Sequence, residues 1–90
     1  MIFRLRSGVE DADFLTIDGR VQTEVAYQCA GLLRRTLARD GERWLVLQIW
    51  ATPSACFDGA RAVAASSLGR DFSALVDQAT LRVERFGAAA

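Results

Sequence analysis

Histidine, lysine and asparagine are all absent from this chain of 90 residues. Without histidine, the chain cannot build metal centres on imidazole, histidine-based catalytic triads or haem sites with an axial histidine. Without lysine, Schiff-base chemistry is excluded as well. Every basic residue is arginine, which stays protonated and does not shuttle protons near neutral pH. These absences exclude many familiar catalytic sites, and we expect neither a metal nor any other cofactor.

Excess charge and long apolar runs are also lacking. Eleven basic residues balance eleven acidic ones, so no net field favours nucleic acid or an anionic membrane as a partner. The first residues include no apolar stretch of signal-peptide length. The longest uncharged run, Trp44 to Phe57, is too short to span a bilayer. We therefore expect a cytoplasmic protein in which Cys29 and Cys56 stay reduced.

The first half of the chain predicts three strands and one helix. Alternating side chains predict a short strand at Ile2 to Arg6, and apolar residues at helical spacing predict a helix from about Glu10 to Gln28. A second strand is expected at Leu32 to Arg39. The dipeptide Asp40-Gly41 is typical of a tight hairpin turn, and it leads into a third strand from Glu42 to Ala51.

The second half predicts a helical region and a last strand. Thr52-Pro53 is a typical helix start, because threonine caps the helix and proline fits its first turn. We expect this helix to run toward Leu68, where Gly69 interrupts it before a short helix restarts at Asp71. Alternation from Thr80 to Phe86 predicts a fourth strand. We assign residues 1–87 to one domain and 88–90 to a C-terminal tail.

This order of elements predicts an α+β fold of ferredoxin-like βαββαβ layout, in which a four-stranded antiparallel sheet carries two helices on one face. The third strand is apolar on both sides, so we expect both of its faces to be covered. The face expected under the helices carries Phe3, Leu5, Leu33, Leu37, Leu45, Leu47, Ile49, Leu81 and Val83. The opposite face carries Arg4, Arg34, Thr36, Trp44, Val46, Gln48, Trp50, Arg82 and Phe86.

That opposite face holds too much apolar surface for a small monomer, above all Trp44, Val46 and Trp50. A second copy of the chain, stacked through the same face, would cover it in a symmetric homodimer. The alternative is a monomer whose long side chains shield this face.

Three segments resemble a known family. They are Ala30 to Arg35 at the start of the second strand, the strand that ends in Trp50 just before a helix start, and the small-residue helix Ala55 to Ala65 with the following Phe72 to Asp77. Over roughly Gly31 to Phe86, the chain resembles the antibiotic-biosynthesis-monooxygenase-type domains of the dimeric α/β-barrel superfamily. The resemblance implies that two copies join through their sheets to form such a barrel.

The resemblance also implies a monooxygenase-like enzyme that needs no metal or flavin and acts on an aromatic or polyketide-like substrate. In that family, a pocket between sheet and helices holds a phenolic or anthrone-like molecule whose anion reduces oxygen. Trp50 matches the family's tryptophan and Tyr27 its tyrosine, which makes these two residues the catalytic candidates. The family's asparagine has no counterpart here. The haem-degrading branch is set aside, since it needs an axial histidine.

Further residues are candidates for binding a small aromatic ligand. Gln48 shares a predicted face with Trp50, while Arg34 and Arg82 lie on the same predicted face and would form an anion-binding cluster. Phe57 and Phe72 are expected to line the same pocket from the helices.

Each candidate also has an ordinary structural interpretation. Trp50 would be a core or interface aromatic, and Tyr27 a surface residue near a helix end. Gln48 would bond across the dimer, and the arginines would form a solvated ion-pair face with Glu84. The alternative function is therefore a non-catalytic dimeric module for ligand binding or assembly, with a pocket that is small or filled by phenylalanine side chains.

Overall fold

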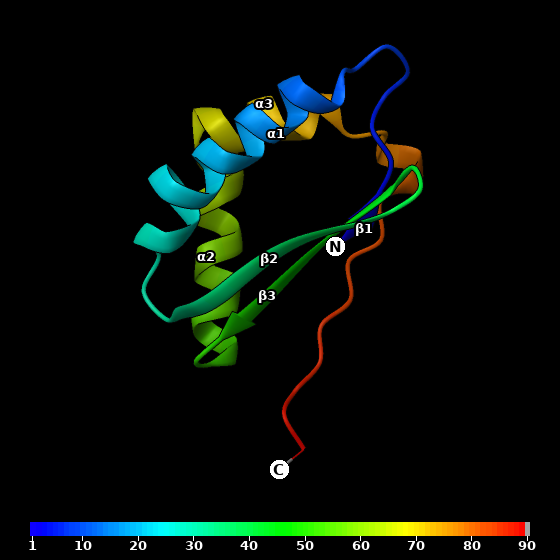
Figure 1. Cartoon of the computed structure of the whole chain (residues 1–90). Helices are drawn as coiled ribbons and strands as arrows, with labels where there is room; N and C mark the ends of the chain where they lie inside the picture. The colour runs from blue at the N-terminus through cyan, green and yellow to red at the C-terminus, as the bar shows by residue number, and fades with distance from the viewer. Residues whose placement is uncertain (90) are drawn as a thin grey trace.

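A computed structural model describes residues 1–89 and shows an α+β fold, in which a small sheet carries its helices on one side (Figure 1). The sheet has three antiparallel strands in the order β1-β3-β2. The strands are β1 (Ile2–Phe3), β2 (Leu32–Asp40) and β3 (Arg43–Trp50). The helices are α1 (Asp11–Arg20), α2 (Pro53–Ala65) and α3 (Ser67–Leu75), with a π-helical turn at Val21–Val25 and 3₁₀ turns at Ala26–Gln28 and Gln78–Thr80. The last residue of the predicted 88–90 tail lies outside the described residues.

The α+β class is confirmed, but the ferredoxin-like layout with four strands and two helices is wrong. The segment predicted as a fourth strand makes only one antiparallel bridge, in which Arg82 and Ile2 exchange two backbone hydrogen bonds of 2.9 Å. The first strand is also shorter than expected, since beyond Phe3 only Leu5 pairs, in an isolated bridge to Val76. Isolated bridges therefore replace a ladder at this corner of the sheet.

The predicted helical region divides at Ser66 and not at Gly69. The Ser66 hydroxyl accepts a hydrogen bond of 2.9 Å from the Gly69 amide and caps α3, as the Thr52 hydroxyl caps α2 by accepting from the Ala55 amide at 3.1 Å. Gly69 lies inside α3. A Cβ at this position would collide with the Val63 carbonyl, so the packing requires glycine there. Within residues 1–89, no helix combines the length and apolar content needed to cross a bilayer.

The predicted hairpin is present, but its turn lies one residue later than expected: Asp40 ends β2 and pairs with Arg43, so Gly41, at φ +61°, and Glu42 form the turn. One irregularity changes which side chains share a face. Leu32 lies opposite Trp50 and Arg34 lies opposite Ile49, so Leu33 is an extra residue in a β-bulge. Because neighbouring residues of a strand point to opposite faces, the bulge shifts the alternation of β2 by one residue. Leu33 is left 63% exposed.

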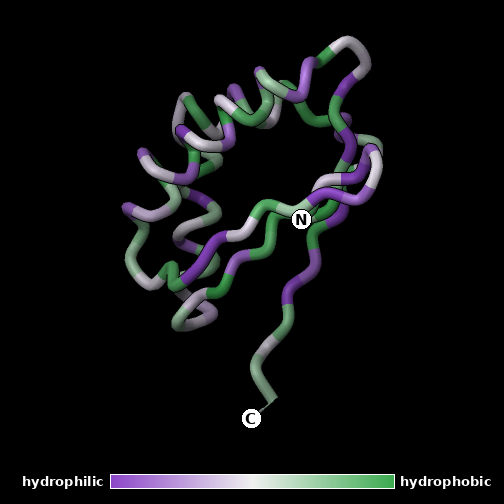
Figure 2. Tube along the Cα trace, viewed as in Figure 1, coloured by the Kyte–Doolittle hydropathy of each residue, from purple (hydrophilic) through white to green (hydrophobic). Residues whose placement is uncertain are grey.

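The core lies between the sheet and α1 and α3. Four aromatic rings form its centre, with centroid separations of 4.9 to 5.7 Å. They belong to Phe3, Phe14, Trp44 and Phe72, all of which are buried. Figure 2 shows that apolar residues are not confined to this core, because the strands carry green stretches and the C-terminal segment turns green again toward its end.

Candidate functional site

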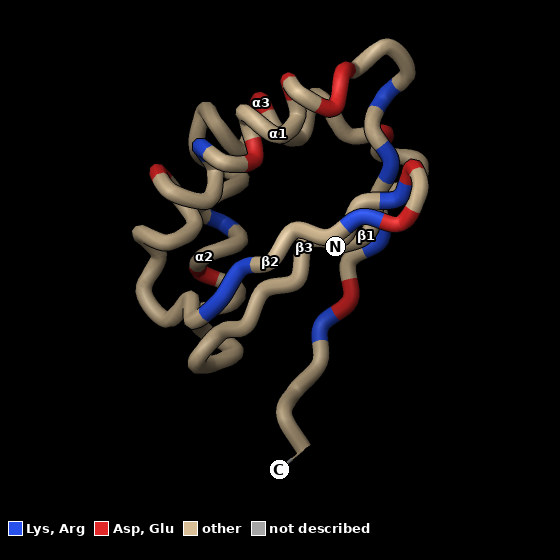
Figure 3. The backbone as a smooth tube through the Cα atoms, viewed as in Figure 1, with Lys and Arg blue, Asp and Glu red and all other residues tan. Residues whose placement is uncertain are grey.

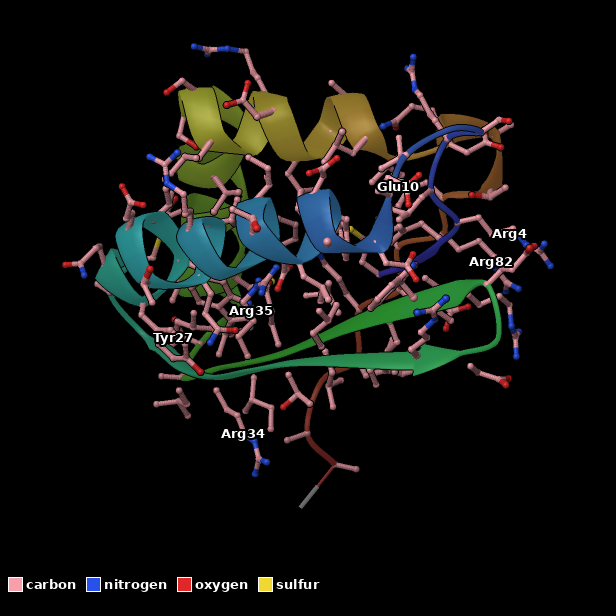
Figure 4. All side chains as sticks on the ribbon, turned by 45° about the horizontal axis from the view of Figure 1, so that its top comes forward. Arg4, Glu10, Tyr27, Arg34, Arg35 and Arg82 are labelled. Carbon is pink, nitrogen blue, oxygen red and sulfur yellow. The ribbon has the colours of Figure 1, made fainter. Side chains whose placement is uncertain are left out.

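One face of the sheet has no helix over it. Figure 4 shows Arg35 pointing toward the helices and Arg34 pointing away from them. The side chains that share the outer side with Arg34 are set by strand register and form what we call the open face: Ile2, Arg34, Thr36, Ala38, Leu45, Leu47 and Ile49. Leu47 is 52% exposed and Ile49 47%. The open face is therefore largely aliphatic. Arg34 is charged, and at the hairpin end the Asp40–Arg43 ion pair lies on the same side by strand register.

The centre of the open face is hollowed. A depression of about 210 Å³ is lined by Arg34 and Thr36 of β2 and by Leu47 and Ile49 of β3. The Arg34 Nε donates a hydrogen bond of 3.3 Å to the Thr36 hydroxyl. Seven other arginines form ion pairs with carboxylates, but Arg34 has no such partner within residues 1–89. Figure 3 shows basic residues together at the start of β2, whereas basic and acidic residues mix around the β2–β3 turn.

The predicted assignment of faces for β3 is wrong. Trp44 and Val46 are 4% and 3% exposed and lie under the helices, whereas the leucines expected there face outward. The reason is that β3 is apolar on both sides, so its alternation alone does not say which side the helices cover. In this structure, Phe3 pairs with Trp44, and both rings join the aromatic core.

Trp50 and Gln48 share the helix-covered side with Trp44. The Trp50 ring lies directly against Gly59 of α2, where a Cβ would collide with its six-membered ring. Gln48 lies opposite Arg35 in the β2–β3 register. Trp50 therefore packs between the sheet and α2 and requires a glycine on that helix, whereas Gln48 lies beside Arg35 on the covered side.

Tyr27 uses its hydroxyl on the backbone. The Tyr27 hydroxyl accepts a hydrogen bond of 2.8 Å from the Arg35 amide and lies 3.4 Å from the Arg35 carbonyl oxygen, to which it donates. These bonds fix the end of the first helical segment to β2. The hydroxyl thus makes a structural contact with the backbone of β2.

A buried ion pair lies next to Tyr27 and was missed at the sequence level. The Arg35 guanidinium donates to both carboxylate oxygens of Asp18, at 2.7 and 3.1 Å, and to the Gln22 side chain at 3.3 Å. The side chains of Arg35 and Asp18 are only 2% and 5% exposed. One signal was available, since of two adjacent arginines in a strand one must face inward. Nothing in the sequence, however, identified Asp18 as its partner.

The remaining candidates are dispersed. Phe72 is buried in the aromatic core, while Phe57 on α2 is 54% exposed, with the Arg85 guanidinium 5.2 Å from its ring centroid. Arg82 pairs with Glu84 at 3.1 Å. Because β1 and β3 separate the Arg82 segment from β2, Arg82 and Arg34 do not form the predicted anion-binding cluster.

A second depression, of about 420 Å³, lies between the end of the first helical segment and α2. Cys29, Thr52, Ser54 and Asp58 contribute to its lining. None of the residues predicted as catalytic or ligand-binding lines it. The structure thus separates the predicted residues among the core, the α2 side and the open face.

Comparisons with known proteins identify no relative. No protein-family model, curated protein or solved structure matches the chain. The resemblance to antibiotic-biosynthesis-monooxygenase-type domains therefore stays a prediction.

Proposed function

We propose that this protein is a small self-associating module, which assembles by stacking its open face against the open face of a second copy. The observation that carries the proposal is the pairing of exposed Leu47 and Ile49 around a hollow on a helix-free sheet face. Burying apolar surface between two such faces is favourable, and two sheets pack stably at about 10 Å when their side chains interlock.

The sizes of the side chains on the open face support the same proposal. On the open face, Thr36 and Ala38 are small and lie beside the larger side chains of β3, so that the face is uneven and able to interlock. A symmetric pair meets through identical surfaces, which makes a self-complementary shape sufficient for assembly. Arg34 enters such an interface without a carboxylate partner from its own described chain.

The monooxygenase activity suggested by the resemblance is a separate prediction that no comparison tests. Its two catalytic candidates serve packing and backbone contacts, since Trp50 lies against Gly59 and the Tyr27 hydroxyl bonds the backbone of Arg35. The assembly proposal needs no chemistry from either residue. We place the assembly in the cytoplasm, where the two unpaired cysteines, Cys29 and Cys56, would stay reduced.

The test is sedimentation velocity over a concentration series, with native mass spectrometry as a second measurement. We expect the unmodified protein to be a dimer at micromolar concentration. Leu47→Arg places a charge at the centre of the interface and should weaken the dimer by roughly 100-fold or more. Circular dichroism should show that the variant keeps its fold, because Leu47 is half exposed in the isolated chain.

Leu15→Arg is the matched control. Leu15 is 48% exposed, close to Leu47 in exposure, but it lies on α1 and away from the open face. We expect this variant to dimerise like the unmodified protein. A protein that is monomeric at every concentration, or a Leu47→Arg variant with undiminished dimerisation, would contradict the proposal.

A further inference from the structure

The chain beyond Arg82 leaves the body of the molecule as an extended segment (Figure 1). We call residues 83–87 the arm. Phe86 is 87% exposed, more than any other large apolar side chain of the described chain, and Val83 is 50% exposed. An aromatic side chain held this far from its own core is a large apolar surface without a contact, which is typical of a residue that inserts elsewhere.

Strand pairing places Phe86 on the side of the open face. Ile2 pairs with both Leu45 and Arg82, so the Arg82 side chain lies on the open-face side of the sheet. In an extended segment, alternate residues share a side, and the Arg82–Glu84 ion pair agrees with this. Arg85 lies on the other side, over Phe57 of α2. Continued to Phe86, this alternation puts its side chain on the same side as Arg82 and Glu84.

The same pairings fix how far along the sheet Phe86 lies. Leu45 and Arg82 are at one level, because both pair with Ile2, and both segments run antiparallel to β1. Phe86 is four residues beyond Arg82, and Ile49 is four residues beyond Leu45. An arm that continued in the strand direction would thus bring Phe86 to the level of Ile49, which lines the hollow of the open face.

In its own chain, the arm is displaced from that hollow across the sheet, perpendicular to the strands. The arm begins beside β1, whereas the hollow lies between β3 and β2 on the far side of the sheet. Strands are about 4.8 Å apart, so the sideways separation is roughly 10–12 Å. Because Phe86 is 87% exposed, it does not fill the hollow of its own chain.

A second copy removes this offset. Rotation about a twofold axis between the stacked sheets, parallel to the strands, exchanges the left and right edges of the sheet and keeps each level along it. On this basis, which rests on the self-association proposed above, we propose that each copy inserts its Phe86 into the Arg34–Thr36–Leu47–Ile49 hollow of the other.

Size and charge fit this occupant. The hollow measures about 210 Å³, and a cavity of about 150 Å³ is enough to hold benzene. Leu47 and Ile49 offer aliphatic walls, and the Arg34 guanidinium is available to lie over the ring. Glu84, on the same side of the arm as Phe86, then approaches the Arg34 that lacks a carboxylate in its own described chain. Within residues 1–89, the Glu84 side chain bonds Arg82 alone.

The first test is disulfide trapping between different copies. One copy carries Phe86→Cys and the other Ile49→Cys with a mass tag, both in a Cys29→Ser, Cys56→Ser background that still dimerises. Mild oxidation should give a mixed disulfide in high yield, while Leu15→Cys in place of Phe86→Cys should give little. A chain with both new cysteines that closes only on itself would assign Phe86 to its own hollow and overturn the proposal.

The second test is a charge exchange measured by sedimentation. Arg34→Glu and Glu84→Arg should each weaken the dimer, and the double variant should recover most of the affinity, because each copy then offers the reversed pair. Phe86→Ala should weaken the dimer roughly tenfold or more. If Leu47→Arg breaks the dimer while Phe86→Ala and both charge variants leave it intact, the stacked face stands and the arm contact is wrong. A protein that never dimerises rejects both.

Discussion

The arginines on the two faces of the sheet have opposite surroundings. On the covered face, Arg35 is 6% exposed and its guanidinium bonds Asp18 and Gln22. On the open face, the neighbouring Arg34 bonds a threonine hydroxyl and meets no carboxylate within residues 1–89. Adjacent residues of one strand thus differ completely in their surroundings. A buried charge requires its partner inside the fold, whereas an exposed one is free to find its partner in another molecule.

The apolar residues show the same difference. On the covered face, Trp44 and Val46 are buried and belong to the core, where the Trp44 ring packs against Phe14 of α1. On the open face, Leu47 and Ile49 keep about half of their surface exposed. The covered face therefore stabilises the monomer, and the open face holds apolar surface whose burial requires another chain.

The largest expected effect comes from leaving the buried arginine without its carboxylate. Asp18→Ala removes the partner of Arg35 and should destabilise the fold by about 3–5 kcal/mol, since an unpaired buried charge is costly. Urea denaturation followed by circular dichroism measures the change in the free energy of unfolding. If the variant unfolds outright, Asp18→Asn, which keeps one acceptor oxygen, provides a milder comparison.

Asp11→Ala is the control for Asp18→Ala, because Arg39 also lies 4.7 Å over the Trp44 ring and donates to the Gly41 carbonyl. Arg39 pairs with Asp11 at 2.7 Å, but the two side chains are 46% and 47% exposed. An exposed pair contributes no more than about 1 kcal/mol. Equal losses of stability in the two variants would mean that burial does not distinguish these two ion pairs, and that Asp18 and Arg35 remain hydrated in solution.

A second prediction compares neighbouring residues of β3. Val46→Ala should cost about 2 kcal/mol, because it deletes buried methyl groups and leaves a cavity among the core side chains. Leu47→Ala removes more atoms but should cost less than about 1 kcal/mol, provided that unfolding is measured where the protein is monomeric. Repeating both measurements at high concentration sharpens the comparison, since Leu47→Ala should then also lose the stabilisation that assembly adds. A larger monomer effect for Leu47 would reverse our assignment of the faces.

The sequence predicted well those elements that local signals determine. The hairpin, with its turn at Gly41 and Glu42 one residue later than predicted, the two strands around it and the Thr52-Pro53 helix start are all present. Each depends on residues within a few positions of one another, and on glycine, proline or a capping hydroxyl with a specific backbone role. The helix expected from Glu10 to Gln28 is also present, although it changes to a π-helical turn at Val21–Val25.

The failures concern contacts that join distant residues. The faces of β3 were assigned wrongly because only packing against Phe3 and Phe14 shows which apolar side is covered. Leu33 was expected under the helices but is an exposed bulge residue, and no local sequence pattern indicated the bulge. The Thr80 to Phe86 segment has strand-like alternation but pairs at Arg82 alone. The predicted site residues were expected on one face of the sheet. In the structure, Trp50 and Gln48 lie on the covered side and Arg34 on the open side, so they do not form one site.

The smallest effect is expected from an exposed ion pair, which completes the comparison with the buried one. On the outer surface of the first helical segment, the Arg20 Nε donates a hydrogen bond of 2.8 Å to Glu24, and this bond lowers the pKa of the Glu24 carboxyl below its usual value of 4.5. A carboxyl with a lowered pKa in the folded state stabilises the fold above pH 4.5. That stabilisation is lost as the pH falls through the folded-state pKa.

Arg20→Ala isolates this contribution through its pH dependence. The variant should be slightly less stable than the unmodified protein at pH 7, and part of that difference should vanish as the pH falls from 7 to 3 through the lowered folded-state pKa of Glu24. Any change in helix propensity is the same at both pH values and cancels. Urea denaturation at low salt makes the comparison, and added salt should shrink the pH 7 difference because the pair is exposed. A difference that is unchanged from pH 7 to pH 3 would show that the Arg20–Glu24 contact does not persist in solution. The contrast between exposed and buried arginines would then rest on Arg35 alone.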